Sequence, residues 1–234
     1  MKRFFIIWLS LLCVLCCQAQ QRHALIVAIA NYPKESGWNS IHSNNDLQIL
    51  LPQFDRLGFR INTLTDKHAT KKNIIQALQP LIKQLKAGDD VCLHFSCHGQ
   101  QMEDDNGDEA DELDEALIPY DAQSTYQKGI YEGENHLRDD ELEKFLISIR
   151  QKIGIDGSVL ITFDACHSGT ANRIEEYVED DDAPIRGTNV IFSSNPFYIA
   201  PGNKHIERKT KLAQQNGLSP ICIISACQPF QRNF

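Results

Sequence analysis

The sequence predicts an α/β fold in which a mostly parallel central sheet is covered by helices on both faces. Short apolar runs of strand length alternate with longer segments in which apolar residues recur at helical spacing. Two of the apolar runs break off abruptly into polar clusters, as buried parallel strands do when they carry reactive side chains at their carboxyl ends. These observations indicate one α/β domain with a site at one end of its sheet.

The first 19 residues have the features of a secretory signal peptide, so they are left out of the predicted fold. Lys2 and Arg3 form a basic start, residues 4–17 are apolar, and Cys17-Gln18-Ala19 supplies the small residues of a cleavage site. A lipoprotein signal fits less well, because no small residue stands just before a cysteine that would carry the lipid. We expect residues 20–234 to form one mature domain that is exported to a periplasm or out of the cell. No later segment is long and apolar enough to predict a membrane span.

The charge of the chain narrows the classes of partner. The formal net charge is −8, and removal of Lys2 and Arg3 with no acid brings it to −10. This balance argues against nucleic acid and anionic membranes as partners. It suits cationic peptides or metal cations.

The cysteines do not form a disulfide framework. Eight fall to five once Cys13, Cys16 and Cys17 leave with the signal peptide, and no Cys-x-x-Cys motif remains. Four of the five lie in apolar, strand-like runs and are predicted to be small buried side chains: Cys92, Cys97, Cys222 and Cys227.

In the first half of the chain the pattern predicts three strands and two helices. The strands cover residues 22–30, 59–65 and 90–98. The first helix begins at Asn44-Asn45-Asp46 and ends near Gly58, with a buried apolar stripe from Leu47 to Leu57. The second covers residues 70–85 and is stopped by Lys86-Ala87-Gly88.

The second half begins with an acidic loop and then resumes the alternation. A brief strand is predicted at residues 116–120 and a helix from Asp139-Asp140-Glu141 to residue 154, its first-turn acids complementing the helix dipole. Further strands are predicted at 159–166, 189–192 and 221–226. The chain stops at Phe234 directly after a strand, with no closing helix, which indicates a truncated reading frame or an abbreviated architecture.

The two strands that break off into polar clusters supply a nucleophile and a base. One ends at Asp164, Cys166 and His167, and the other ends at His98. Cys166 would attack as a thiolate, and His98 would form that thiolate and protonate the leaving amine. The backbone N–H groups of Gly99 and Cys166 could hold the oxyanion of the intermediate.

Alternative roles for these residues fit the sequence less well. Considered alone, Cys166 would be predicted to be a buried thiol and His98 a histidine whose hydrogen bonds are satisfied. Two strand ends with the same pattern, an apolar run that breaks into a polar cluster, favour a catalytic role for both residues instead. His167 should point away from its neighbour Cys166 and is expected to be structural. A zinc site made by Cys97, His98, Cys166 and His167 lacks the paired ligand spacing of structural zinc modules.

The acidic loop is either a solvated surface or a calcium site. Nine acids occur there without a basic residue, and hard cations select clustered carboxylates. An EF-hand does not fit around Gly107, because Met102 stands where its first ligand should be. The acids are Glu103, Asp104, Asp105, Asp108, Glu109, Asp111, Glu112, Asp114 and Glu115.

The motifs resemble those of the caspase-like superfamily and, within it, the metacaspases, here of a bacterial type. Ser96-Cys97-His98-Gly99 is similar to the metacaspase histidine motif, and residues 164–169 are similar to the cysteine motif. The resemblance covers essentially all of the mature chain. Supporting stretches are Asn44-Asn45-Asp46, Gly107-Asp108-Glu109, Leu113-Asp114-Glu115, Ile118-Pro119-Tyr120-Asp121 and Asp139-Asp140-Glu141.

The resemblance implies a three-layer α/β/α sandwich and a cysteine endopeptidase with a dyad of His98 and Cys166. It implies cleavage after arginine or lysine, with Asp46, Ser96 and Asp164 in the specificity pocket. A carboxylate that faces a guanidinium gives charge-assisted, bidentate recognition, so the residues themselves also favour a basic side chain.

The resemblance also implies regulation. No cofactor is required for the chemistry, but Asp114, Asp139 and Asp140 look like the calcium ligands of the family, while Arg173 stands where a further ligand is expected. Arg173 and Arg186 are the expected self-cleavage sites. Two hypotheses from other classes stay open: a catalytically inactive scaffold or peptide-binding domain on the same fold, and a calcium-binding surface protein.

Overall fold

A computed structural model describes residues 20–107, 109, 112–165, 186–188, 190–199 and 217–226. The predicted signal peptide lies outside these residues. In the described part of the chain, no helix is long and apolar enough to cross a membrane.

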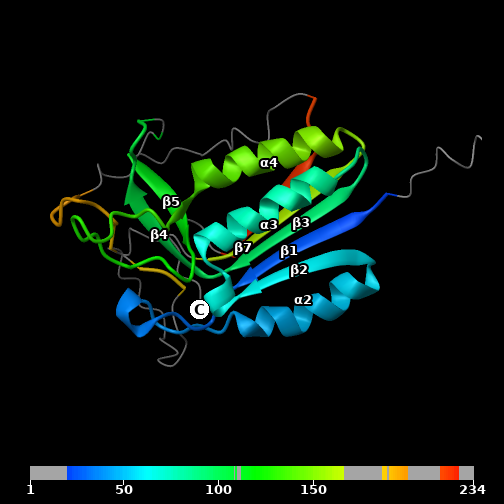
Figure 1. Cartoon of the computed structure of the whole chain (residues 1–234). Helices are drawn as coiled ribbons and strands as arrows, with labels where there is room; N and C mark the ends of the chain where they lie inside the picture. Colours follow the sequence, from blue (N-terminus) through cyan, green and yellow to red (C-terminus); the bar gives the residue numbers. More distant parts are fainter. Residues whose placement is uncertain are drawn as a thin grey trace, which may run out of the picture.

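A five-stranded parallel sheet forms the centre of the fold, in the order β2-β1-β3-β7-β8 (Figure 1). Its central strands are almost entirely buried, which explains why they are continuous apolar runs rather than alternating ones. The strands are β1 (Arg22–Ala28), β2 (Phe59–Thr65), β3 (Asp90–Ser96), β7 (Ser158–Asp164) and β8 (Ile221–Ser225).

Among the described residues, three helices flank this sheet: α2 (Asn44–Arg56), α3 (Lys71–Gln84) and α4 (Asp139–Ile153). Helices α3 and α4 lie together over the sheet, and α2 lies along β2 on the side away from them (Figure 1). The Thr70 hydroxyl caps α3 by accepting a hydrogen bond from the Asn73 N–H at 3.2 Å. Two short 3₁₀ helices, η1 (Lys34–Ser36) and η2 (Asp66–His68), complete the helical elements of the described residues. The mostly parallel sheet flanked by helices confirms the predicted fold class.

The buried stripe predicted for α2 is wrong. None of its residues is fully buried, and Ile49 is 65% exposed. Leu57, just after the helix, is 48% exposed. This helix packs mainly against β1 and β2 at one edge of the sheet, so part of its apolar surface stays exposed.

A second, antiparallel sheet lies beyond the carboxyl ends of the central strands. It consists of β4 (His98–Glu103), β5 (Leu113–Ile118) and β6 (Leu137–Arg138), in that order. Strand β4 was not expected, because its sequence, His98-Gly99-Gln100-Gln101-Met102-Glu103, is mostly polar and has no apolar period. The strand predicted at 189–192 is not formed: Phe192 makes only an isolated parallel bridge to Met102, and Asn189 lies outside the described residues.

The predicted burial of the cysteines is confirmed in part. Cys92 and Cys97 are buried among β3 and its neighbours, and both are free thiols. Cys222 is exposed, contrary to the prediction, because β8 is the last strand of the described sheet and pairs only with β7 there. Cys227 lies outside the described residues.

Candidate active site

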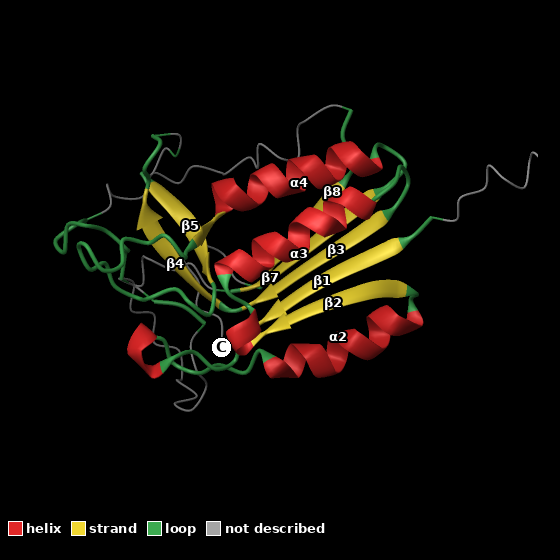
Figure 2. Cartoon of the chain, in the orientation of Figure 1, coloured by secondary structure: helices red, strands yellow, loops and turns green. Residues whose placement is uncertain are grey.

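The candidate site lies where the central strands end. The arrowheads of β1, β3 and β7 point toward the end of the sheet beside which β4 and β5 lie (Figure 2). Ser96, the last residue of β3, pairs in register with Asp164, the last residue of β7. The strand leading to His98 is therefore the neighbour of the strand leading to Cys166. Cys166 and His167 themselves lie outside the described residues.

The ring of His98 is held on several sides. Its Nε2 atom lies 2.8 Å from the backbone oxygen of Asn39, and the indole of Trp38 stacks on the ring at 4.8 Å between centroids. The Tyr32 hydroxyl accepts a hydrogen bond from the His98 N–H at 3.1 Å and donates one to the Ile118 carbonyl at 2.9 Å. The orientation of the imidazole is thus set by residues that sequence reasoning did not single out.

These surroundings also decide which nitrogen of His98 carries the proton. Burial lowers the pKa of His98 to about 4, although the Asn39 and Arg186 carbonyls partly oppose this, so the ring is neutral at pH 7. A neutral ring that hydrogen-bonds the Asn39 oxygen must carry its proton on Nε2. The Nδ1 lone pair is then available: this atom is buried and makes no well-formed hydrogen bond within the described residues.

The three predicted pocket residues lie together, and the guanidinium of Arg186 lies among them. Its Nη2 atom is 3.1 Å from Asp164 Oδ2, and its Nη1 atom donates to Ser96 Oγ at 2.8 Å. Nη1 also donates to Ser43 Oγ at 3.0 Å. Ser43 was missed from the sequence, where the only signal was its position directly before the Asn44-Asn45-Asp46 motif.

Asp46 completes the negative charge of this pocket. Burial alone would raise its pKa, but polar contacts with His94 and Ser96 and the charge of Arg186 outweigh that effect and hold the pKa at about 2. His94 in turn is positioned by Thr162, whose hydroxyl lies 2.7 Å from its Nδ1. Two carboxylates therefore face one guanidinium in a buried site.

The predicted oxyanion donor Gly99 also has a partner. Its N–H donates a hydrogen bond to the carbonyl oxygen of Arg186 at 3.2 Å. The second predicted donor, the N–H of Cys166, lies outside the described residues. The Gly99 N–H thus points at the carbonyl oxygen of Arg186, which lies next to the His98 ring.

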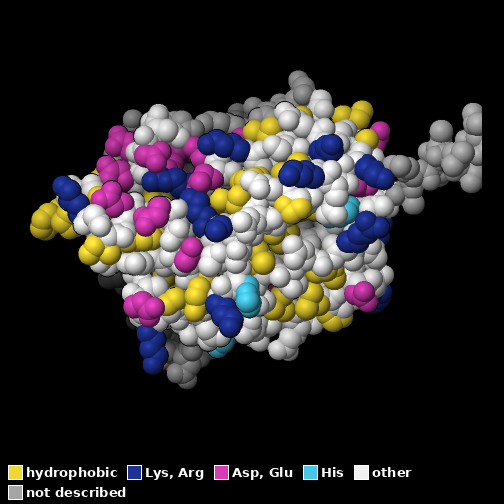
Figure 3. Space-filling view, viewed as in Figure 1, with side chains coloured by type: hydrophobic (Ala, Val, Ile, Leu, Met, Phe, Trp, Pro, Cys, Tyr) yellow, Lys and Arg dark blue, Asp and Glu magenta, His cyan; other side chains and the backbone are white. Residues whose placement is uncertain are grey.

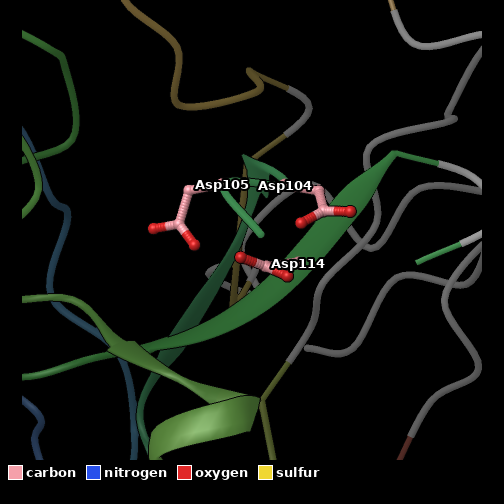
Figure 4. A group of neighbouring side chains, drawn as sticks. All are labelled: Asp104, Asp105 and Asp114. Carbon is pink, nitrogen blue, oxygen red and sulfur yellow. The ribbon is translucent and has the colours of Figure 1, made fainter. Parts of the chain in front are cut away.

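A separate acidic site lies at the tip of the β4–β5 hairpin, at the end of the molecule where acidic side chains gather (Figure 3). The carboxylates of Asp104, Asp105 and Asp114 converge there, with oxygens that all lie within 4.8 Å of one another (Figure 4). Arg138 pairs with Asp114 and, at 3.4 Å, with Asp105. The expected ligand Asp114 is thus grouped with Asp104 and Asp105, whereas Asp139 and Asp140 are not members of that group.

Asp114 and Asp139 are nevertheless coupled, and their environment fits a hard cation. Burial, together with neighbouring acids, raises the pKa of Asp114 to about 6 and that of Asp139 to about 7, with Asp114 and Asp140 among the charges that act on Asp139. The Oδ1 atoms of Asp114 and Asp139 are buried without a hydrogen-bond partner in the described structure. Carboxylate oxygens are ligands that calcium prefers.

Cys97 and His98 do not belong to a group with metal-ligand spacing in the part of the chain that the structure describes, and Cys166 and His167 lie outside that part. Burial raises the pKa of the Cys97 thiol to about 12. Within the described residues, the acids at the β4–β5 tip form the one group of histidine, cysteine and acidic side chains that meets the spacing of a metal site.

A parallel sheet that ends at a buried histidine and an acidic pocket, with a cysteine motif directly after the next strand, defines a protein of the caspase-like class. The family model for the metacaspase, peptidase C14 domain matches residues 22–174. The chain belongs to this metacaspase family.

Individual relatives agree with this assignment. Metacaspase-2 of Arabidopsis thaliana is 30% identical over 184 residues, which cover 71% of this chain and 41% of the relative. Metacaspase-1B of Aspergillus fumigatus is 36% identical over 103 residues, 44% of this chain and 22% of the relative. The chain therefore spans less than half the length of these curated relatives.

A solved structure supports the fold. The crystal structure of a Geobacter sulfurreducens protein superposes with a TM-score of 0.60 and covers 91% of this chain and 75% of its own. Its sequence identity is 24%, so this likeness concerns the fold alone.

Proposed function

We propose that the chain is a cysteine endopeptidase that uses His98 and Cys166 as a dyad and cleaves peptide bonds after arginine or lysine. The observation that carries this proposal is the guanidinium of Arg186, held by Asp164, Ser96 and Ser43 beside the His98 ring. Family membership supports the cysteine chemistry, because Cys166 stands in a motif similar to that of the metacaspases.

The chemistry follows from the protonation state of His98. The Nδ1 atom takes the proton of the Cys166 thiol, and the resulting thiolate attacks the carbonyl carbon of the substrate. The N–H of Gly99 stabilises the oxyanion. The protonated Nδ1 then gives its proton to the leaving amine, and water hydrolyses the thioester with His98 again as the base. No cofactor takes part in these steps.

The charge of the pocket accounts for the proposed substrate preference. A guanidinium or ammonium group would be paired with Asp164 and would lie in the field of Asp46, whose pKa of about 2 keeps it ionised. An aspartate side chain would meet two like charges in a buried site, which is strongly unfavourable. Peptides with arginine or lysine before the cleaved bond are therefore the proposed substrates.

Calcium is the cation that we propose for the acidic site. Asp114, Asp139 and Asp140 would hold it, with Asp104 and Asp105 close enough to contribute. The ion would supply positive charge that relieves the repulsion between these carboxylates and joins the β4–β5 tip to the start of α4. Because this site is distinct from the dyad, calcium would stabilise the fold around the active site rather than act on the substrate.

Two further features complete the proposal. Residues 1–19 would direct export to a periplasm or out of the cell. Self-processing after a basic residue would activate the chain, with Arg173 and Arg186 as the candidates.

A catalytically inactive, peptide-binding form is the second candidate. It is favoured by one observation: the pocket is filled by a residue of the same chain. Hydrolysis separates the two candidates.

The experiment compares hydrolysis of a fluorogenic peptide ending in arginine by the mature chain and by two variants. Cys166→Ala and His98→Ala should each reduce the rate by at least about 10³-fold. Matched controls are Cys222→Ala, an exposed thiol, and His68→Ala, an exposed histidine, which should keep the rate. Full activity in Cys166→Ala would refute the peptidase proposal, and a folded chain that binds but never cleaves the peptide would establish the inactive form.

A further inference from the structure

His94 reaches the specificity pocket from within the central sheet, although it is not one of the residues predicted for that pocket. It lies on β3, which pairs with β1 on one side and with β7 on the other. Its Nε2 atom is 3.5 Å from Oδ2 of Asp46, and the side chain of His94 is only 9% exposed. A buried histidine therefore faces one of the two carboxylates of the pocket.

The two atoms that face each other have no alternative partner in the part of the chain that the structure describes. Nε2 of His94 and Oδ2 of Asp46 are both buried, and neither makes a well-formed hydrogen bond there. An ionised carboxylate can only accept a hydrogen bond, so the nitrogen that faces it must carry a proton. Because a buried polar group without a partner is costly, this contact holds the ring and the carboxylate together.

A third side chain fixes the ring of His94 in this orientation. Thr162 lies opposite His94 in the register of β3 and β7, and its hydroxyl is 2.7 Å from Nδ1 of the ring. When Nε2 carries the proton of a neutral ring, Nδ1 accepts the hydrogen bond of the Thr162 hydroxyl. The contacts from Thr162 through His94 to Asp46 thus connect β7, β3 and the first turn of α2.

Asp46 depends on such a contact more than the other acid of the pocket does. Asp164 ends a strand whose backbone is fixed by pairing with β3. Asp46 stands in the first turn of α2, a helix in which no residue is fully buried. Burial would raise the pKa of Asp46, and the contact with His94 is the largest of the effects that hold it at about 2 instead. His94 thus connects a carboxylate on an edge helix to the centre of the sheet.

We propose that His94 is a positioning residue for substrate selection: its Nε2–H fixes the carboxylate of Asp46 in the pocket, and Thr162 fixes the ring. His94 acts on the substrate through Asp46. The inference rests on the proposed function, in which the pocket binds an arginine or lysine side chain. It adds to that function a residue that decides how strongly the charge of the substrate is recognised.

The first test uses the fact that glutamine and asparagine replace different nitrogens of a histidine. The amide of glutamine can take the place of Nε2, and the amide of asparagine can take the place of Nδ1. His94→Gln should therefore keep a donor for Asp46, whereas His94→Asn should keep a contact with Thr162 and lose that donor. The measurement is kcat/KM of the self-processed enzyme for two peptides with arginine or citrulline, its uncharged analogue, before the cleaved bond.

His94→Asn should lower the ratio of kcat/KM for arginine to kcat/KM for citrulline by at least about tenfold, because a hydrogen bond to a charged group is lost. The change should appear in KM of the arginine peptide, since the pocket binds this side chain equally in the ground state and the transition state. His94→Gln should recover most of the loss. Thr162→Val, which removes the hydroxyl and keeps the shape, should lower the ratio in the same direction.

The matched control is His23→Asn. His23 is also a buried histidine, with Nε2 3.5 Å from Oδ2 of Asp89, but it lies near the start of β1 and not at the end of the strands that forms the pocket. The control should keep the ratio of the wild type. An equal loss in His94→Gln and His94→Asn, or the same loss in the control, would mean that His94 acts through packing and would overturn the proposal.

The second test needs no catalysis and uses NMR spectroscopy of the histidine ring nitrogens in the uncut Cys166→Ala chain. The ring of His94 is identified by the signals that disappear in the double variant Cys166→Ala, His94→Asn. Its Nε2 should carry a proton, and the resonance of that proton should shift when Asp46→Asn replaces the carboxylate. A ring protonated on Nδ1 alone, or a resonance that Asp46→Asn leaves unchanged, would overturn the proposal.

The outcomes separate the inference from the function on which it rests. A chain that hydrolyses no arginine peptide overturns the proposed function, and the NMR experiment then decides whether His94 holds Asp46. A chain that prefers the arginine peptide equally with and without His94→Asn overturns the inference and leaves the peptidase proposal standing.

Discussion

At the scale of single residues, burial rather than proximity to a charge sets the properties of His98. The ring is stacked on Trp38, and its Nε2 is held by the Asn39 carbonyl, so it stays neutral and presents Nδ1. Neither Trp38 nor Asn39 was identified from the sequence, since both lie in an irregular segment whose path depends on tertiary packing. The motif predicts His98 as the base, but it could not predict how the ring is oriented.

The lowered pKa of His98 makes a prediction about stability and pH. The folded chain holds this pKa at about 4, whereas an unfolded histidine has the ordinary value of 6.5, so between these values the unfolded state binds more protons. Stability should therefore fall as the pH drops from 6.5 toward 4. His98→Asn cannot titrate and should lose about 2 kcal/mol less between pH 7 and pH 5.

Urea unfolding of the uncut Cys166→Ala chain, with and without His98→Asn, measures this difference. His136, with its pKa lowered to about 3 by burial, and His23, with its pKa lowered by burial, remain in both proteins and contribute equally. The same loss of stability in both proteins would show that His98 is not held neutral by the fold.

Ser43 carries a prediction about substrate binding. Its hydroxyl contacts the guanidinium in the pocket but does not cap α2, so its removal should spare the helix. Ser43→Ala should lower kcat/KM for arginine peptides by about tenfold to a hundredfold, since hydrogen bonds to charged groups are worth about 1.5–3 kcal/mol. The assay uses the self-processed enzyme.

The matched control for Ser43 is Ser219→Ala. Ser219 is fully buried, and its hydroxyl has no partner in the described structure. An equal loss of kcat/KM in both variants would mean that Ser43 acts through packing alone.

At the scale of elements, the acidic site at the tip of the β4–β5 hairpin lies close enough to the start of α4 for the charges of Asp114 and Asp139 to influence each other. The first turn of α4 brings Asp139 and Asp140 toward acids of the hairpin, and Arg138 already supplies one positive charge to Asp114. The carboxylates remain poorly compensated, because Asp139 keeps a raised pKa of about 7. A bound cation should therefore stabilise this part of the fold.

Calcium is expected to raise the Tm of the uncut Cys166→Ala chain by about 5–10 °C at saturating concentration. Asp139→Asn should abolish this response and should also raise the Tm in chelator, because it removes a buried charge that its neighbours repel. Scanning calorimetry in calcium and in chelator measures both effects. Asp156→Asn, an exposed control after α4, should keep the full calcium response. An unchanged response in Asp139→Asn would exclude this residue as a ligand.

The helices and strands also show which parts of the fold could be predicted from sequence patterns. Strands β1, β2, β3 and β7 and helices α3 and α4 lie close to their predicted ranges, because buried parallel strands and amphipathic helices have strong periodicities. Strand β4 was missed because its stability comes from pairing with β5, not from an apolar pattern. The stripe on α2 was misjudged because periodicity shows which face is apolar but not how much of it is covered.

At the scale of the whole molecule, the site joins two sheets. Asp164 and Ser96 come from the parallel sheet, Gly99 from the antiparallel one, and the segment that starts at Arg186 contacts both. The sequence predicted Asp46, Ser96 and Asp164 as pocket residues, and the structure places them together. It could not predict that Arg186 lies among them, because that contact depends on how distant segments pack.

The most direct test of an acidic specificity pocket is the rate of hydrolysis of two peptides that differ only in having arginine or citrulline before the cleaved bond. Citrulline has the same shape but no charge, so the comparison isolates the pairing with Asp164 and Asp46. We expect kcat/KM for the arginine peptide to be at least about a hundredfold higher, because the citrulline peptide leaves the partly buried carboxylates of Asp46 and Asp164 without a cation. Equal values for the two peptides would contradict an acidic specificity pocket at the ends of β3 and β7.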